Sequence, residues 1–159
     1  QIQSHDVGMI ILQFGGNAVP YIADTAAVKR YGQWFASQIR LFQVLVPNTA
    51  IIVVGPSDMA VKNGQNMVTY PMLIPVRNAL REATLNENAL YWDVFEVMGG
   101  EGSMAAWATS EPKLASSDHV HFTRRGAKKV ASLLVQSLDA EWAAWQTHQR
   151  TPESTLHLP

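Results

Sequence analysis

The sequence contains no cysteine among its 159 residues. Disulfide bonds, thiolate metal sites and cysteine nucleophiles are therefore excluded. It also lacks a charge bias, because 12 basic and 13 acidic residues leave a net charge of −1. Binding to nucleic acid or to an anionic membrane would require a basic face, and the composition does not indicate one.

Long apolar runs are missing as well. No stretch reaches the length of about 18 apolar residues that a transmembrane helix needs, and no signal peptide is recognisable. The sequence starts at Gln1, which leaves room for a targeting segment upstream. A composition that is 47% hydrophobic and 16% charged is typical of one globular domain with a core of its own.

Short apolar runs alternate with stretches of helical periodicity. The apolar runs predict three strands, at residues 7–14, 49–55 and 89–93, of which the first is expected to be buried on both faces. Apolar residues at helical spacing predict three helices, at residues 24–46, 70–85 and 123–145. This alternation is typical of an α/β protein with a parallel sheet.

The remaining segments are predicted to be irregular. Residues 56–65 are rich in Pro, Ser, Asn and Gly, which predicts a loop, and residues 94–115 are expected to form a loop with short helices. We find no repeat and no linker, so residues 1–147 are assigned to a single domain. Residues 148–159 have two prolines and no periodicity, and are predicted to be a mobile tail.

Asp118 and His121 stand three residues apart, immediately before the last predicted helix. A turn of this length can direct the Asp118 carboxylate to Nδ1 of His121, which would fix the tautomer and stabilise the imidazolium. Thr123 is placed to cap the helix. The alternative is an exposed polar loop with an incidental histidine, because such residues are common before helices.

Gly15, Gly16 and Asn17 follow the first predicted strand. Ligands of open α/β sheets bind outside the carboxyl ends of the strands. The side-chain amide of Asn17 could donate hydrogen bonds to an oxyanion there. The alternative is a plain turn, which Gly and Asn favour for backbone reasons.

Together these residues resemble the SGNH/GDSL family of serine esterases and lipases. The matching motifs are Gly15-x-Asn17 and, about a hundred residues later, Asp118-x-x-His121-x-Thr123-x-x-Gly126. The resemblance runs from the third strand of that family's fold to its last helix. It implies a three-layer, flavodoxin-like α/β/α fold in which Asn17 is an oxyanion donor, His121 the general base and Asp118 its orienting partner. Gly16 would lie beside the substrate, whereas His119 is not a matching position.

The family's nucleophile motif, Gly-Asp-Ser, is absent, and so is its second motif. Ser57 has a similar context, Gly55-Pro56-Ser57-Asp58, but follows the strand that matches the family's fourth, so it is expected only at the rim of the site. Ala18 replaces the aspartate that usually follows the asparagine, which removes a support of that loop. The chain is therefore interpreted as a C-terminal portion of a hydrolase domain. Its N-terminal strands and serine would come from an upstream segment or a companion chain.

Residues 92–107 resemble a subset of these enzymes that acts on acetylated carbohydrate, including cell-wall glycan. Gly99 and Gly100 would let a loop bend closely over a ligand. Met104 and Trp107 would offer that ligand an apolar wall. The alternative is that Met104 and Trp107 simply belong to the core of a short helix.

The resemblance implies a serine esterase that hydrolyses short acyl esters, preferably O-acetyl, on carbohydrate or cell-wall glycan. It implies no metal, no cofactor and a secreted or periplasmic bacterial location, while charge and hydropathy already predict no nucleic-acid partner and no membrane span. The alternative is a catalytically inactive glycan- or partner-binding module derived from such a hydrolase. A flavodoxin-like or response-regulator domain is a third, weaker interpretation, because a phosphate-binding loop and an acidic cluster are both missing.

Sheet topology adds one expectation. In the flavodoxin-like strand order 2-1-3-4-5, the third strand is an interior strand. Residues 7–14 match that strand and carry neither charge nor proline to protect an open edge. We therefore expect a strand from polypeptide outside the 159 residues to pair with them, supplied by an upstream part of the same protein, a separate chain or a swapped copy.

Overall fold

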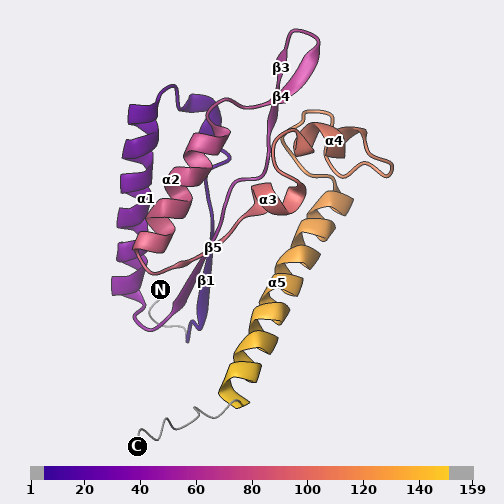
Figure 1. The fold of residues 1–159 in the computed structure, drawn as a ribbon. Helices are drawn as coiled ribbons and strands as arrows, with labels where there is room; N and C mark the ends of the chain where they lie inside the picture. The colour runs from indigo at the N-terminus through magenta and orange to yellow at the C-terminus, as the bar shows by residue number, and fades with distance from the viewer. Residues whose placement is uncertain (1–5, 151–159) are drawn as a thin grey trace, which may run out of the picture.

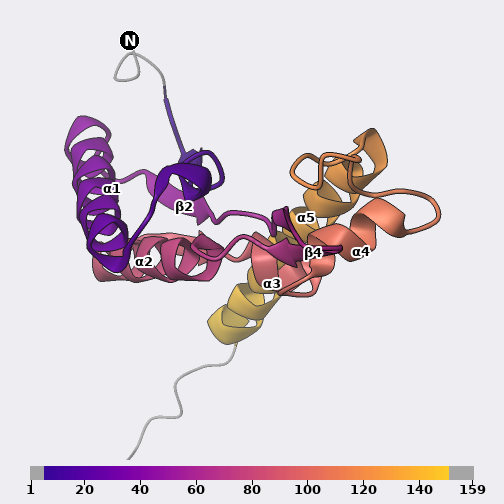
Figure 2. The ribbon, with the colours of Figure 1, turned by 90° about the horizontal axis from the view of Figure 1, so that it is seen from above.

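The computed structural model describes residues 6–150, which form a parallel sheet with helices on both faces (Figure 1). The sheet has the order β1-β2-β5, with strands β1 (Met9–Gln13), β2 (Ala50–Val54) and β5 (Leu90–Trp92). Helices α1 (Thr25–Leu45) and α2 (Leu73–Asn86) lie together on one face, and α5 (Arg124–Arg150) lies on the other (Figures 1 and 2). The predicted α/β fold with a parallel sheet is confirmed.

The α1 helix forms as its sequence predicts. The Asp24 carboxylate accepts a hydrogen bond from the backbone N–H of Ala27 at 2.7 Å, which caps the helix. Apolar residues repeat every three or four positions, so one stripe of the helix is buried. On that side, Gly32 lets α1 approach α2, because a Cβ at this position would lie 3.3 Å from that of Ala79.

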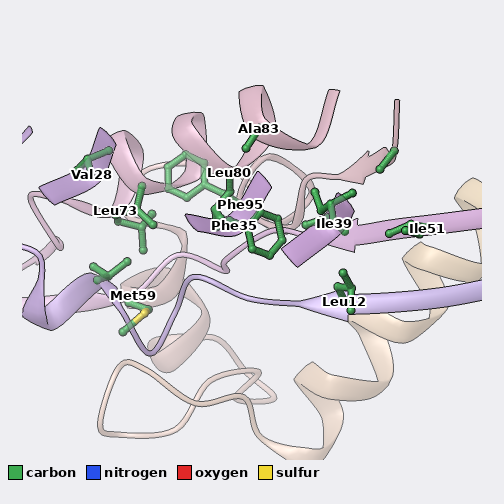
Figure 3. Close-up of a cluster of buried hydrophobic side chains, with 14 residues drawn as sticks. Leu12, Val28, Phe35, Ile39, Ile51, Met59, Leu73, Leu80, Ala83 and Phe95 are labelled. Carbon is green, nitrogen blue, oxygen red and sulfur yellow. The ribbon is translucent and has the colours of Figure 1, made fainter. Parts of the chain in front are cut away.

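The main core lies between the sheet and the α1–α2 layer (Figure 3). Leu12 of β1 and Ile51 and Val53 of β2 point toward this layer. Phe35 and Leu80, from α1 and α2, are completely buried against them. A second core joins the end of β2 to the short helices α3 (Val94–Met98) and α4 (Ser103–Thr109) and to the start of α5.

The segment predicted as a loop at residues 56–65 contains a strand instead. β3 (Ala60–Asn63) and β4 (Asn66–Thr69) form an antiparallel hairpin with a two-residue turn at Gly64 and Gln65. Gly64 has a φ of +61°, a value that glycine adopts without strain. The hairpin projects beyond the carboxyl ends of the parallel strands (Figure 1).

Two helix boundaries also differ from the predictions. α2 starts at Leu73 rather than at residue 70, so Pro71 precedes the helix and Pro75 lies in its first turn, where no intrahelical N–H is needed. α5 continues to Arg150, past the predicted end at residue 145. It therefore includes the first three residues of the predicted tail, whose remainder lies outside the described residues. Among residues 6–150, no helix combines the length and apolar character that crossing a membrane requires.

The first strand is less buried than predicted. Met9 and Ile11 are 46% and 52% exposed, and they point away from the α1–α2 layer. Within residues 6–150, β1 pairs only with β2, so it is an edge strand there. The prediction that both its faces are buried is therefore wrong for the described part of the chain, in which no element covers this second face.

Candidate functional site

The loop that carries Asp118 and His121 closes on itself. The backbone N–H of Ser116 donates to the carbonyl oxygen of His121 at 2.8 Å, and that of His119 donates to the carbonyl of Ser116 at 3.1 Å. His119 has a φ of +56°, in the left-handed region, which reverses the chain between these two bonds. The loop therefore has a defined conformation, although it is exposed.

Asp118 organises this loop through both of its carboxylate oxygens. Oδ1 accepts hydrogen bonds from the backbone N–H groups of Val120, at 2.9 Å, and His121, at 3.0 Å. Oδ2 lies 2.8 Å from Nδ1 of His121. This last distance confirms the predicted contact between the two side chains.

Hydrogen bonding keeps Asp118 ionised. The backbone N–H of His121, then its ring, then the N–H of Val120 lower the pKa of Asp118 from 3.8 to about 2. An ionised carboxylate only accepts hydrogen bonds, so Nδ1 of His121 carries the proton in the neutral ring. Nε2 is then left as the proton acceptor.

Nε2 of His121 faces open space in the described part of the chain. The His121 side chain is 78% exposed, and no residue among 6–150 donates a hydrogen bond to Nε2. His119 instead directs its Nδ1 to the carbonyl of Ser117 at 2.9 Å. His121 can therefore exchange a proton with an incoming group, and His119 is not part of the pair.

Thr123 and Gly126 attach the loop to the start of α5. Thr123 Oγ1 donates to the carbonyl of Lys113 at 2.8 Å and accepts from the N–H of Gly126 at 3.2 Å, which confirms its predicted capping role. A Cβ at Gly126 would lie 1.9 Å from the carbonyl oxygen of Leu114. Capping of α5 therefore explains Thr123, and the close approach of Leu114 explains why position 126 is a glycine.

Asn17 lies in the turn after β1. Gly15 has a φ of +107°, and its carbonyl accepts from the N–H of Ala18 at 2.9 Å. The turn borders a cavity of about 550 Å³ that also reaches Ser57, after β2. Gly16, Asn17 and Ser57 are thus together at the carboxyl ends of β1 and β2, as the sequence predicts.

The cavity and the Asp118–His121 loop are linked through Met59 and Ala60. A Cβ at Gly16 would lie 3.7 Å from the sulfur of Met59, and the N–H of Ala60 donates to the carbonyl of His119 at 2.9 Å. Asp118 and His121 do not line the cavity. No hydrogen bond joins Ser57 to His121 in the described part of the chain, and the convergence of Asn17 with the acid–base pair stays a prediction.

The glycine-rich segment after α3 turns beside a cavity, but only some of the residues predicted to contact a ligand there border it. Gly99 and Gly100 have φ values of +116° and +78°, and Gly99 borders a cavity of about 300 Å³. Met104 is completely buried, so its predicted role as a wall for a ligand is wrong. Trp107 borders the same cavity as Gly99, and it also packs in the second core, where it is 7% exposed and its ring lies 5.7 Å from that of Phe122.

Asp58 is a site-neighbouring residue that the sequence analysis missed. It is completely buried. Its carboxylate accepts hydrogen bonds from Thr69 Oγ1 and the N–H of Met104, both at 2.8 Å, and from Ser103 Oγ at 3.5 Å. Asp58 thereby ties the segment after β2 to the β3–β4 hairpin and to the start of α4. The sequence signal for this role was that Asp58 stands next to the apolar Met59 and Ala60. A carboxylate that is buried among apolar residues requires hydrogen-bonding partners.

Comparisons with known proteins support the fold. No protein-family model matches the sequence, and no curated protein matches it. The chain is similar to a solved structure described as a peptidoglycan O-acetylesterase in action, with a TM-score of 0.77 and 23% identity. The match covers 86% of this chain and 38% of that one, so the chain spans well under half of its length. The α/β fold expected from the SGNH resemblance is thereby confirmed.

Proposed function

We propose that this chain forms the acid–base portion of a serine esterase. The observation that carries the proposal is the Asp118–His121 pair, with its 2.8 Å contact and an open Nε2. A histidine held in one tautomer by an ionised carboxylate is suited to take a proton from a hydroxyl and return it. Asn17, in the turn after β1, would donate its amide N–H to the oxyanion.

The reaction has two steps. The serine oxygen attacks the ester carbonyl while Nε2 of His121 takes the serine proton. The tetrahedral intermediate then expels the alcohol, which receives that proton from His121. In the second step His121 takes a proton from water, the hydroxide attacks the acyl-serine, and the carboxylic acid leaves as the proton returns to the serine. Asp118 stays ionised throughout and stabilises the imidazolium.

The serine would come from outside the described residues. Ser57 lies on the cavity of Asn17 and has no hydrogen bond to His121. The open edge of β1 offers a place for one more strand, and the turn at the end of that strand would reach the cavity. We assign this strand to an upstream segment of the same protein or to a companion chain.

The substrate would be a short acyl ester, in particular O-acetyl, on carbohydrate or cell-wall glycan. The resemblance of residues 92–107 to enzymes acting on acetylated carbohydrate supports this, as does the structural similarity to a peptidoglycan O-acetylesterase. Such a substrate lies outside the cytoplasm, which fits a secreted or periplasmic location.

An inactive glycan- or partner-binding module is the second candidate. The observation that favours it is the lack of any residue among 6–150 that hydrogen-bonds to Nε2 of His121. In that case the Asp118–His121 pair would only maintain the loop.

Acetate release from O-acetylated peptidoglycan separates the two candidates. The assay compares the protein expressed from its complete reading frame with its His121→Ala variant and with residues 1–159 alone. The esterase proposal expects release by the complete protein only. No release by the complete protein, together with binding of the glycan, would leave the binding module, whereas equal release by the His121→Ala variant would remove His121 from the catalytic machinery.

A further inference from the structure

Positive charge is concentrated around the Asp118–His121 loop and the first turns of α5. Residues 111–129 contain five of the 12 lysines and arginines but only two of the 13 acidic residues. The net charge of −1 for the whole sequence therefore conceals a local excess of positive charge. The five basic side chains are all exposed, and they are Lys113, Arg124, Arg125, Lys128 and Lys129.

Four of these five cations have no ion-pair partner within residues 6–150, where the salt bridges involve only Arg40, Arg77 and His121 as cations. The fifth, Lys129, holds its ammonium 5.2 Å from the centre of the Trp107 ring, and this contact partly satisfies its charge. We call the other four cations the basic rim, which consists of Lys113, Arg124, Arg125 and Lys128.

The basic rim lies on one side of the start of α5. Successive helical residues turn by about 100°, so Arg124, Arg125 and Lys128 fall within an arc of about 100°. This arc faces away from the half-buried stripe of the helix. Lys113 lies beside the same turn, because its carbonyl accepts the 2.8 Å hydrogen bond from Thr123 Oγ1. The four cations therefore form one surface at the end of α5 that adjoins the loop.

This placement of the cations is unfavourable without a partner. The first turn of a helix carries the equivalent of about half a positive charge, which repels cations. α5 has no acidic residue in its first turn to offset that repulsion, and the rim cations also repel one another. An anion bound at the rim would relieve both effects.

The basic rim lies close enough to His121 to act on a substrate held there. Between the Cα atoms of His121 and Arg124 the chain spans at most about 11 Å, because only three residue steps separate them. The Debye length is about 10 Å at 0.1 M ionic strength. At moderate salt, the field of the rim therefore extends to the proton-accepting ring.

The remaining charges of the chain decide which kind of anion fits the rim. Outside residues 111–129 the sequence has seven lysines and arginines against eleven acidic residues. A nucleic acid or an anionic membrane presents dense negative charge over a large area, which this acidic remainder would repel. Single carboxylates spaced along a glycan would meet the rim alone, and the forked donors of arginine match a carboxylate well.

We propose that the basic rim binds carboxylate groups of the glycan that carries the ester. The proposal rests on the proposed function, since the ester is taken to be cleaved at His121, and it narrows the substrate to an anionic glycan. An acyl ester on a neutral glycan would lack this interaction.

Two forms of one substrate test the proposal. One is O-acetylated peptidoglycan, and the other is the same material after carbodiimide coupling of its carboxylates to ethanolamine. The coupling replaces each negative charge by a neutral amide and keeps the acetyl esters. The protein expressed from its complete reading frame is assayed for acetate release on both forms, and the ratio of the two initial rates is the readout.

The rim variant is Arg125→Glu/Lys128→Glu, which reverses the charge of the exposed arc. The matched control is Arg30→Glu/Arg81→Glu, which makes the same change of charge at exposed positions of α1 and α2, on the other face of the sheet (Figure 2). Circular dichroism checks the fold of each variant. If the rim variant does not fold, Arg125→Gln/Lys128→Gln removes the same two positive charges and takes its place.

We expect the parent protein to release acetate from native peptidoglycan at least about tenfold faster than from the amidated form, because electrostatic steering raises encounter rates by roughly 10–10³. The rim variant should lower this ratio toward one, as should added salt, and the control variant should keep it. A ratio near one for the parent protein, or an equal fall in both variants, overturns the proposal. Binding to duplex DNA or to phosphatidylglycerol vesicles that the rim variant loses, with an unchanged ratio on the glycan, overturns it as well.

Sedimentation with peptidoglycan distinguishes the failure of this proposal from the failure of the proposed function. Suppose that the parent protein releases no acetate, but that its His121→Ala variant binds native peptidoglycan and amidation removes this binding. That result would leave the basic rim standing and remove the proposed function. Acetate release at equal rates from both forms of the substrate would do the reverse.

Discussion

At the scale of single residues, the Asp118 carboxylate determines both the shape of the loop and the tautomer of the neutral His121 ring. One oxygen holds two backbone N–H groups and the other holds the ring, so the loop and the base depend on the same charge. The three-residue spacing of the aspartate and the histidine is compatible with both contacts.

The titration of Asp118 follows from these contacts. Its pKa is lowered to about 2, with the backbone N–H of His121 as the largest cause. The stabilisation it gives the loop is therefore fully present above pH 3.8, its ordinary value, and is lost as the pH falls toward 2. A carboxyl carbon NMR titration should give a midpoint near 2. In the His121→Ala variant the backbone N–H remains, so the midpoint should stay clearly below 3.8, and a return to that value would contradict this account.

His121 and His119 should differ sharply in their effect on catalysis. In the catalytically complete protein, His121→Ala should remove nearly all turnover, because His121 is the ring that the Asp118 carboxylate holds in position. His119→Ala should have a much smaller effect, since its ring contacts the carbonyl of Ser117. The measurement is kcat on an acetyl ester, with the fold checked by circular dichroism. Similar losses in both variants would mean that the loop, and not the base, was lost.

Asn17 is the predicted oxyanion donor. Asn17→Ala should lower kcat by roughly 10²–10³ with little change in KM, because the hydrogen bond forms only in the transition state. Ser57→Ala, on the same cavity, is the matched control and should change kcat far less. An unchanged kcat in the Asn17 variant would remove this residue from the oxyanion hole.

At the scale of elements, the sequence predicted what local periodicity and capping determine. The three parallel strands, α1, α2 and α5 all occur where apolar spacing indicates them, and Thr123 caps α5 as expected. The β3–β4 hairpin was missed because its short strands are stabilised by remote contacts, notably the buried bond from Thr69 to Asp58. Met104 was assigned to a ligand wall because sequence alone does not distinguish a buried side chain from a lining one.

The junction between the loop and α5 gives a prediction for Gly126. A Cβ there would overlap the carbonyl oxygen of Leu114, 1.9 Å away, and neither backbone can move freely. Gly126→Ala should therefore lower the free energy of unfolding by about 1–3 kcal/mol, as in other cases of overpacking. Gly8→Ala is the control, because a Cβ at Gly8 meets nothing within 4 Å. Chemical denaturation of the complete protein measures both, and equal stabilities would show that the junction adjusts.

At the scale of the whole molecule, helices cover the two faces of the parallel sheet to different extents. One face of the sheet is covered by α1 and α2 and contains the main core, whereas the other is covered by α5 only near β5. The sequence indicated the open edge, because residues 7–14 read as an interior strand. It did not indicate that Trp142 and Trp145 of α5 are exposed. Apolar residues at helical spacing predict a buried stripe, but they do not identify the element that buries it.

The isolated chain should therefore self-associate. Residues 1–159 purified alone expose the edge of β1 and its apolar face, and unpaired N–H and C=O groups of an apolar edge pair readily with another copy. We expect oligomers or aggregates in light scattering and a broad thermal transition. Ile11→Lys, which places a charge on the exposed face of this edge, should shift the population toward monomer, whereas Ala143→Lys on the far side of α5 should not. A soluble monomer that unfolds cooperatively and hydrolyses esters would contradict both the open edge and the external serine.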